Sequence, residues 1–266
     1  MGRKMKSAPV YFTIAQVRFN PILSLETYAP QIQDRLRKEG FPDFQKALLA
    51  TINLNMNVAP TSEGSPPPQL PMAQTARFMF GNMERTSGFI LDQGALSFQT
   101  TEYDVFETFL QAFLKGLQAV NEAVNLSYTD RIGLRYLDAV FPKSDETVRD
   151  YLSASILGLT EKIDDTIVHS FSETLVKREN VNVRSRVIIQ DGQMGFPPDL
   201  QPITLKVGER FTPLQGRHAI IDTDGWSEAR DPFNVDRIRE QLGAIHAGIE
   251  KTFRASVTEN ALKIWE

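Results

Sequence analysis

One stretch, residues 101–142, restricts the fold more than any other because it joins a long apolar stripe to a strand. Apolar side chains recur there at steps of three and four: Phe106, Phe109, Leu110, Phe113, Leu117, Val120 and Val124. That spacing is the period of an amphipathic helix. Asp104 and Glu107 predict a capping box at its start. The stretch therefore begins with a long helix that needs an apolar surface to cover.

The same stretch continues into a strand after a polar break at residues 127–130. In RIGLRYL, alternation puts Ile132, Leu134 and Tyr136 on one face and Arg131, Gly133 and Arg135 on the other. A helix that leads into a half-apolar strand is typical of helix-on-sheet packing.

Apolar alternation and turn residues predict the remaining elements. In the first part we expect strands at 9–19, 44–58, 75–82, 87–92 and 95–100, a helix at 25–38 and a proline-rich loop at 59–74. In the second part we expect strands at 166–176, 181–190, 203–207 and 217–224, a helix at 145–157, and a long striped helix that opens at Asp231-Pro232. A last short helix follows, capped by Ser256 or Thr258.

Strands in runs followed by helices indicate an α+β fold of antiparallel sheets, each packed against a long amphipathic helix. The natural division is an N-terminal sheet-plus-helix half, 1–142, and a C-terminal half, 143–266, within one compact unit. The two halves have a similar order of elements. Duplication of one unit is one interpretation, and the common arrangement of helix on sheet is the other.

Composition excludes several classes of protein. The 266 residues contain no cysteine, which excludes disulfides, thiolate nucleophiles and cysteine-ligated zinc. No apolar run approaches the length that crosses a bilayer, and the basic start lacks the apolar core of a signal peptide, so we expect a cytoplasmic protein without membrane contact. The net charge of −4 argues against bulk nucleic-acid binding but is compatible with a local basic patch.

Five arginines form the first candidate site: Arg18, Arg131, Arg135, Arg184 and Arg186. Within their strands, Arg131 shares a face with Arg135, and Arg184 shares a face with Arg186. If these strands are neighbours, the guanidinium groups form a row suited to phosphate or carboxylate. The alternative, which we favour, is a solvated sheet face whose arginines pair with glutamates.

The second candidate site is His218, Asp222 and Asp224 in RHAIIDTD, which a strand places on one face. An imidazole and two carboxylates can hold a divalent metal or act as acid and base. We favour the alternative of an exposed His218 and two aspartates that end the strand and its turn. His246, beside the apolar stripe of the last long helix, is expected to be a packed, hydrogen-bonded histidine rather than a ligand.

The sequence shows no phosphate-binding glycine loop, nucleophile elbow or HExxH motif. We therefore expect a non-catalytic recognition or regulatory protein that binds another protein and needs no cofactor. Two alternatives stay open: a metal-dependent hydrolase or nuclease at His218, Asp222 and Asp224, and a nucleic-acid-binding protein that uses the arginine-bearing sheet face. The sequence leaves the partner, any ligand and the oligomeric state open.

Five segments resemble a sporadically distributed bacterial family of mostly uncharacterised proteins: PVYFTIAQVRFNP, TEYDVFETF, RIGLRYLD, IIDTD and the closing LGAIHAGIEKTFRASVTENALKIW. The resemblance spans the chain except residues 59–74 and 191–215. It implies an accessory role in a bacterial defence or mobile-element system, and it carries over no catalytic residue. One departure is Leu137-Asp138, where the family has an apolar residue and often Asn, which argues against a role for position 138.

Overall fold

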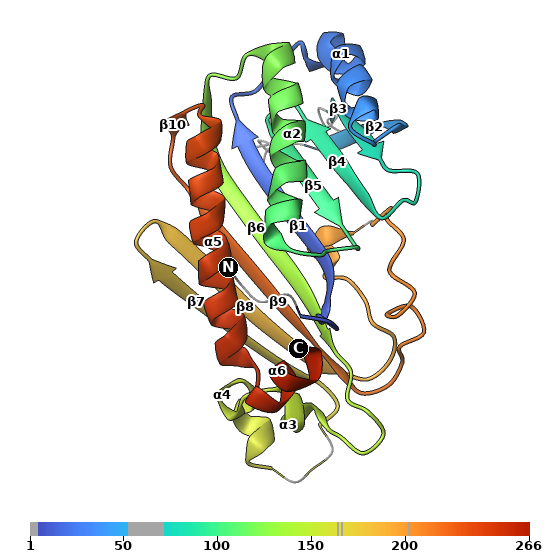
Figure 1. Cartoon of the computed structure of the whole chain (residues 1–266), viewed down its shortest axis with the longest axis vertical. Coiled ribbons are helices and arrows are strands. Elements are labelled where there is room, and N and C mark those ends of the chain that lie inside the picture. The colour runs from blue at the N-terminus through green and yellow to red at the C-terminus, as the bar shows by residue number, and fades with distance from the viewer. Residues whose placement is uncertain (1–4, 53–71, 164, 166, 202) are drawn as a thin grey trace, which may run out of the picture.

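The strands form one continuous antiparallel sheet in the order β2-β3-β4-β5-β1-β6-β9-β8-β7, and the short β10 pairs with β6 (Figure 1). This arrangement comes from a computed structural model that describes residues 5–52, 72–163, 165, 167–201 and 203–266. The predicted mixed fold with a large antiparallel sheet is confirmed. The prediction named several sheets, whereas the described strands join into one.

The strands are β1 (Val10–Phe19), β2 (Asp43–Ile52), β3 (Met72–Gly81), β4 (Ser87–Asp92), β5 (Ala95–Thr100), β6 (Tyr128–Val140), β7 (Ser170–Arg178), β8 (Val181–Gln190), β9 (His218–Ser227) and β10 (Asp231–Pro232). The helices are α1 (Leu25–Lys38), α2 (Phe106–Val124), α3 (Val148–Tyr151), α4 (Ala154–Leu157), α5 (Val235–Ser256) and α6 (Glu259–Trp265), with 3₁₀ turns at Gly158–Glu161 and Pro198–Leu200.

The centre of the sheet is the pair of β1 and β6, which divides the strands into two groups, β1–β5 and β6–β9, at a point that precedes the predicted boundary at residue 142. Each of these two strands is the first of its group, and its other neighbour is the last of that group, β5 or β9. From there each group continues outward in reverse chain order, through β4, β3 and β2 on one side and β8 and β7 on the other. Both edges of the sheet are therefore formed by hairpin strands.

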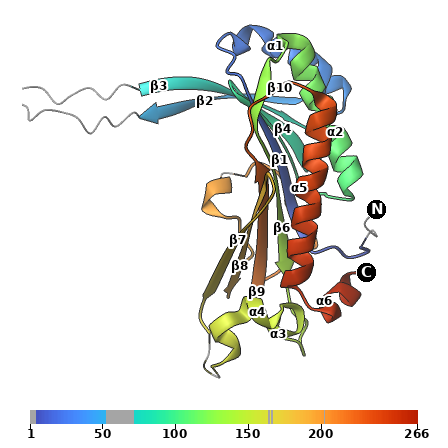
Figure 2. The ribbon, with the colours of Figure 1, turned by 90° about the vertical axis from the view of Figure 1, so that its left-hand side faces the viewer.

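The helices α1, α2, α5 and α6 lie on one face of the sheet, here called the helix face (Figure 2). Close contact with this face depends on glycine at two positions. A Cβ on Gly116 of α2 would lie 2.1 Å from Cε1 of Phe89, and a Cβ on Gly225 of β9 would lie 2.7 Å from Cγ2 of Ile245 in α5. Both contacts are far inside van der Waals distance, so only glycine allows the long helices to approach this closely.

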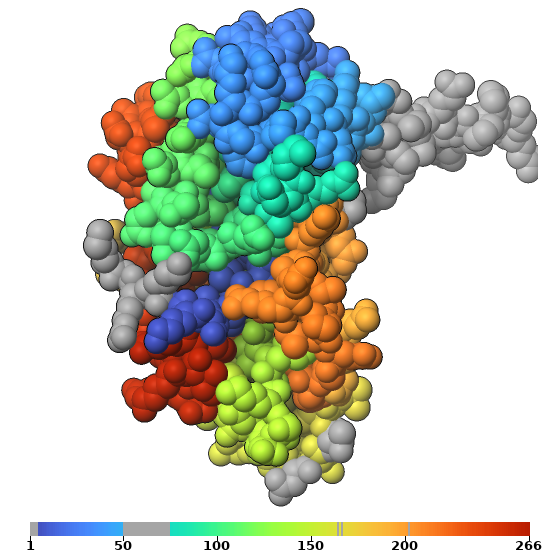
Figure 3. Space-filling model, turned by 45° about the vertical axis from the view of Figure 1, so that its right-hand side comes forward, coloured from blue at the N-terminus to red at the C-terminus, as the bar shows by residue number. Residues whose placement is uncertain are grey.

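The opposite face, here called the loop face, is covered in part by residues 194–214, which have an apolar core of their own with β1, β6 and β9. An extra residue in β1 disrupts the register with β6 between Val10 and Phe12, and both Tyr11 and Phe12 are fully buried in this core. The Tyr11 hydroxyl donates a hydrogen bond to the carbonyl of Gly195 at 2.8 Å. Figure 3 shows the edge of this covering segment in orange beside the dark blue N-terminal segment.

Several local predictions need correction. The predicted capping box at Asp104 and Glu107 is wrong, because the N-cap of α2 is Val105 and has no side-chain cap. Asp231-Pro232 does not open the last long helix; it forms β10, and Asn234 caps α5 by accepting from the N–H of Arg237.

Two further segments differ in extent. Residues 203–207 contain no strand, and the single helix predicted at 145–157 is two short helices. Of the two candidate caps of the last helix, Thr258 is the one observed. Residues 53–58 of the predicted second strand and 59–71 of the predicted loop lie outside the described residues.

Candidate functional site

The five candidate arginines lie on the loop face of neighbouring strands, β1, β6 and β8, with β9 between β6 and β8. Arg18 stands directly opposite Arg131 in the β1–β6 pair. The strand adjacency that the arginine row requires is therefore present. The intervening strand β9, however, contributes Asp222 and Asp224 to the same face.

Arg135 and Asp222 form the buried centre of this face. Nε and Nη2 of Arg135 donate to the two carboxylate oxygens of Asp222 at 2.7 and 2.8 Å, and Nη1 donates to Asp199 at 2.6 Å. Burial lowers the pKa of Arg135, but the hydrogen bonds to the two aspartates outweigh it and raise the pKa overall. Nη2 of Arg186 lies 2.8 Å from Asp222 as an ion pair. Two guanidinium groups thus share one carboxylate that is fully buried.

The three outer arginines also have carboxylates beside them. Arg18 pairs with Asp130 at 2.9 Å, Arg131 lies 3.8 Å from Glu228, and Arg184 lies 3.0 Å from Asp224. The carboxylates are mostly aspartates rather than the glutamates that we expected. Because every one of the five guanidinium groups already has an acidic neighbour, a phosphate or carboxylate ligand would compete with internal ion pairs. The anion site therefore stays a prediction.

His218, Asp222 and Asp224 share the loop face but do not converge on one point. Residues four apart on a strand are separated by about 13 Å. His218 is fully buried rather than exposed as expected, with its ring stacked on Phe141 and Nδ1 2.8 Å from the carbonyl oxygen of Gly216. In the ranges that the structure describes, no three histidine, aspartate or glutamate side chains gather around a possible metal position.

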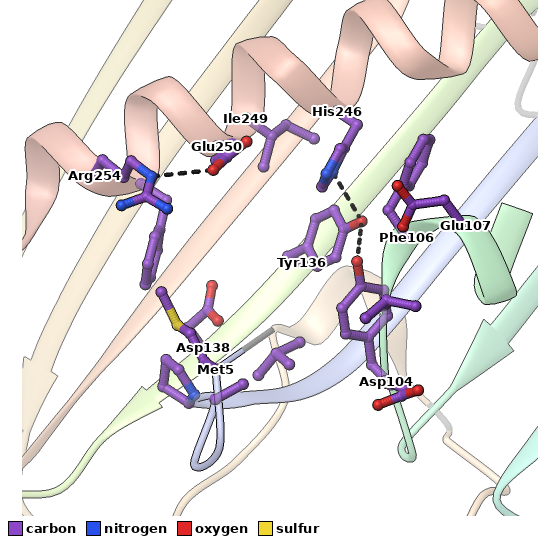
Figure 4. A pocket seen from close by; sticks show the side chains of 16 residues that line it. Met5, Asp104, Phe106, Glu107, Tyr136, Asp138, His246, Ile249, Glu250 and Arg254 are labelled. Carbon is purple, nitrogen blue, oxygen red and sulfur yellow. Dashed lines mark hydrogen bonds and ion pairs between the residues drawn. The ribbon is translucent and has the colours of Figure 1, made fainter. Parts of the chain in front are cut away.

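A cavity of about 160 Å³ on the helix face is a candidate site that the sequence did not predict. Figure 4 shows that its walls come from the start of α2, from α5, from β6 and from the N-terminal segment. The lining residues are Met5, Ala8, Pro9, Val10, Tyr103, Asp104, Val105, Phe106, Glu107, Tyr136, Asp138, His246, Ile249, Glu250, Phe253 and Arg254. In Figure 3 the N-terminal segment lies between α2 (green) and the red C-terminal helices.

Asp138 is the most unusual group in this cavity. Its side chain projects from β6 into the cavity, and the residue is only 7% exposed. It has no side-chain hydrogen bond or ion pair with another residue of the described ranges. Burial, together with the charge of Asp222, raises the pKa of Asp138 to about 8. A buried carboxylate is normally paired or protonated.

A hydrogen-bonded aromatic group lies next to Asp138. The Tyr136 hydroxyl oxygen is 3.2 Å from that of Tyr103 and 3.2 Å from Nδ1 of His246 (Figure 4). The His246 ring stacks on Phe106 with 4.0 Å between centroids. Burial lowers the pKa of His246, which favours the neutral imidazole. The expectation of a packed, hydrogen-bonded histidine agrees with these contacts, but the cavity beside it was not predicted.

Sequence reasoning missed this cavity for a specific reason. The departure at Asp138 from the family pattern was visible, but it was interpreted as an argument against a role. An acidic residue in a strand that is otherwise apolar on that face, with Leu134 and Tyr136 before it, was the signal that could have indicated a buried site.

The edge strand β7 is the third feature with an open surface. Phe171, Leu175 and Val176 are 54%, 58% and 44% exposed. Their partners on β8 place Phe171 and Leu175 on the loop face and Val176 on the helix face, because paired residues in an antiparallel ladder point the same way. In the described part of the chain β7 pairs with β8 alone. Its other backbone edge is available for pairing.

No family model, curated protein or solved structure matches this chain. Over the residues described, no helix is long and apolar enough to cross a membrane.

Proposed function

We propose that this chain is a non-catalytic recognition protein that binds another protein by adding a strand of that partner to β7. The observation that carries the proposal is the exposure of Phe171, Leu175 and Val176 on an edge strand. A free backbone edge supplies hydrogen bonds to an incoming strand, and exposed side chains on both faces supply apolar contact and selectivity.

The edge of β7 lacks most of the features that normally block strand addition. Proteins protect such edges with prolines, short strands, bulges or charged side chains, lysine above all. β7 has nine residues, Ser170–Arg178, contains no proline and pairs with β8 in unbroken register. Its charged residues, Glu173, Lys177 and Arg178, leave the three apolar side chains exposed. A partner strand with alternating apolar residues fits this edge.

The non-catalytic part of the proposal rests on the ion pairs that hold the buried carboxylate of Asp222. The buried carboxylate of Asp222 is held by Arg135 and Arg186, which leaves it no freedom to act as a base or a metal ligand. Its pairing has the character of a structural ion pair, for which removal of one partner is strongly destabilising.

Three wider elements of the proposal have separate support. The matching order of β1–β5 and β6–β9 around the central β1–β6 pair supports descent from a duplicated sheet-plus-helix unit, with α2 and α5 as the equivalent long helices. The five resembling segments support membership in the sporadic bacterial family and an accessory role in defence or mobile-element systems. A cytoplasmic location is proposed because the chain has no cysteine, which is compatible with a reducing compartment.

The test is co-expression of the tagged chain with the products of its neighbouring genes, followed by pull-down and native mass measurement. A stable complex is expected, with slowed amide hydrogen exchange at residues 170–178 because edge N–H groups become paired. Leu175→Lys should abolish the complex, since it places a charge in the centre of the new interface.

The matched control is Leu48→Lys on β2, the opposite edge of the sheet, where Leu48 is 62% exposed. This control should leave the complex intact. Recovery of free monomer alone from the co-expressed genes, or a complex that Leu175→Lys leaves unchanged, contradicts the proposal.

A further inference from the structure

The cavity between α2 and α5 has the size of a small-molecule site. Its volume of about 160 Å³ is close to the ~150 Å³ of an apolar cavity that holds a benzene ring. It is separate from the edge strand β7, which lies at the far end of the sheet from the β1–β6 centre. A ligand here would therefore be independent of the protein contact proposed above.

The floor of the cavity presents a carboxyl group that has no counter-ion among the described residues. Asp138 is only 7% exposed, faces the cavity, and forms no ion pair with another described residue (Figure 4). Removing a carboxylate from water without a partner carries a large desolvation penalty. In the same strand the buried Arg135 has two carboxylate partners, whereas Asp138 has none among the described residues. Without a cation Asp138 is therefore held in its protonated form, and a cation bound in the cavity would supply the partner that its ionised form lacks.

The walls of the cavity are suited to an organic cation. Tyr103, Tyr136, Phe106 and Phe253 line it, and aromatic faces attract ammonium groups through their electron-rich π-systems. Apolar contact with the same rings favours a ligand that carries a hydrocarbon part. A metal ion is less suited to this cavity, because among the described residues no three histidine, aspartate or glutamate side chains gather where they could hold one.

The charge around the cavity points in the same direction. Among the described residues, its lining contains the carboxylates of Glu107, Asp138 and Glu250 and one guanidinium group. That guanidinium group belongs to Arg254, whose Nε donates a hydrogen bond to Oε1 of Glu250 at 3.0 Å. Acidic lining raises the local concentration of cations and repels anions.

We propose that this cavity binds an organic cation, a primary ammonium on a short apolar stem, with Asp138 as its counter-ion. The ammonium lies against the Asp138 carboxylate, and the stem contacts the rings of Tyr103, Tyr136 and Phe106. The Tyr136 hydroxyl, held between Tyr103 and His246, provides a neutral polar contact beside the charge. Two sources present this chemistry, a free amine and the side chain of a lysine.

The test uses probes that differ in charge but little in shape. Benzylamine, benzyl alcohol and benzoate are titrated into the full chain at neutral pH, and amide chemical shifts locate the binding. Benzylamine is expected to bind with a dissociation constant of about 1 mM or below, a reasonable range for a ligand of about eight non-hydrogen atoms. Its affinity should exceed that of benzyl alcohol by about tenfold or more, and benzoate should not bind.

The variants are Asp138→Asn and, as control, Asp130→Asn. Asp138→Asn keeps the shape of the side chain and should remove the preference for benzylamine over benzyl alcohol. Asp130 lies on the same strand but is one-third exposed and paired with Arg18, so its replacement should leave benzylamine binding unchanged. If Asp138→Asn does not fold, the comparison of the three probes on the unchanged chain still decides the matter.

Nα-acetyl-lysine amide distinguishes the two sources of ammonium. Tighter binding of this compound than of benzylamine identifies a lysine side chain as the occupant, and the reverse order identifies a free amine. The proposal is overturned if neither cation binds, if benzylamine binds no more tightly than benzyl alcohol, or if Asp138→Asn retains the full preference.

Discussion

Replacing Asp138 with asparagine should change the pH dependence of stability in a direction that few carboxylate substitutions would. Asp138 is buried and has its pKa raised from the ordinary 3.8 to about 8, chiefly by burial and then by the charge of Asp222. The folded state therefore holds a proton that the unfolded state releases above pH ~4. Because the folded state binds more protons across this interval, stability falls as pH rises from about 4 to about 8 and is then constant.

The magnitude follows from the size of the shift. The difference between 3.8 and about 8 is about 4 pKa units. At about 1.4 kcal/mol per unit, the ionised carboxylate lowers the free energy of unfolding by about 6 kcal/mol above pH 8. About three of those units lie above pH 5, so about 4 kcal/mol should be lost between pH 5 and pH 9. This is a large part of the ~5–15 kcal/mol that stabilises a typical domain.

The Asp138→Asn variant lacks this loss because its amide does not ionise. Burial of the amide without a partner costs about 1–3 kcal/mol, but this cost is independent of pH. The variant should therefore gain about 4 kcal/mol relative to the unchanged chain as pH rises from 5 to 9, whatever the offset between them at pH 5.

Urea unfolding of both chains at pH 5, 7 and 9 measures this difference, without amines in the buffer. Asp130→Asn, on the same strand, shows whether loss of any carboxylate from β6 has the same effect. The other titratable groups that line the cavity with Asp138 are Tyr136 on β6, Tyr103 and Asp104 before α2, Glu107 on α2, and His246, Glu250 and Arg254 on α5, and both chains retain all of them. A difference between the two chains that stays constant within about 0.5 kcal/mol from pH 5 to 9 would refute the reasoning.

Four further outcomes can be measured. Gly225→Val should destabilise the fold by about 1–3 kcal/mol in urea unfolding, because even a Cβ there would lie 2.7 Å from Ile245 of α5; an unchanged midpoint would contradict the packing. Arg135→Met should cost about 3–5 kcal/mol by the same measurement, since it leaves Asp222 buried with only Arg186 beside it, and a neutral result would mean that the pair is not structural. Mg²⁺ and Mn²⁺ should not raise the melting temperature, and a rise that Asp222→Ala removes would instead support the metal-dependent alternative. Filter binding to single-stranded DNA at two salt concentrations should show no strong salt dependence, and a steep one would favour the nucleic-acid alternative.

The elements that sequence reasoning predicted best are those with a strong local pattern. The stripe from Phe106 to Val124 and the turn that joins residues 92 and 95 specify α2 and the β4–β5 hairpin without reference to the rest of the chain. The last long helix was found for the same reason, but its start was misplaced. Proline is favoured at a first helical position, and that preference was outweighed at Pro232 by pairing with Tyr128 of β6.

For the candidate sites too, the sequence predicted what depends on a single strand and missed what depends on pairing between distant strands. Strand alternation placed Arg131 with Arg135 and Arg184 with Arg186, and the structure has all four on one face. Alternation could not show that β9 would come between β6 and β8 and bring carboxylates to this face, because that is a long-range pairing. The sharing of a face also suggested that His218 and Asp222 belong to one site, although strand rise alone separates residues four apart by about 13 Å.

The cavity depended still more on tertiary structure. Its walls come from four segments that are far apart in the chain, and the chain has no motif that marks them. The buried state of Asp138 follows from β6 lying at the centre of the sheet beneath α5, which no local pattern specifies.

The most direct test of the account is an NMR titration of the Asp138 carboxyl carbon in the full chain, first alone and then with saturating benzylamine. The account predicts a midpoint near pH 8 for the free chain, because burial raises the pKa of Asp138 to about 8. With benzylamine the midpoint should move down by at least about one unit, because a cation stabilises the ionised form. A midpoint below about 5 in the free chain, or one that benzylamine leaves in place, would contradict the claim that Asp138 is a buried carboxylate in need of a cation.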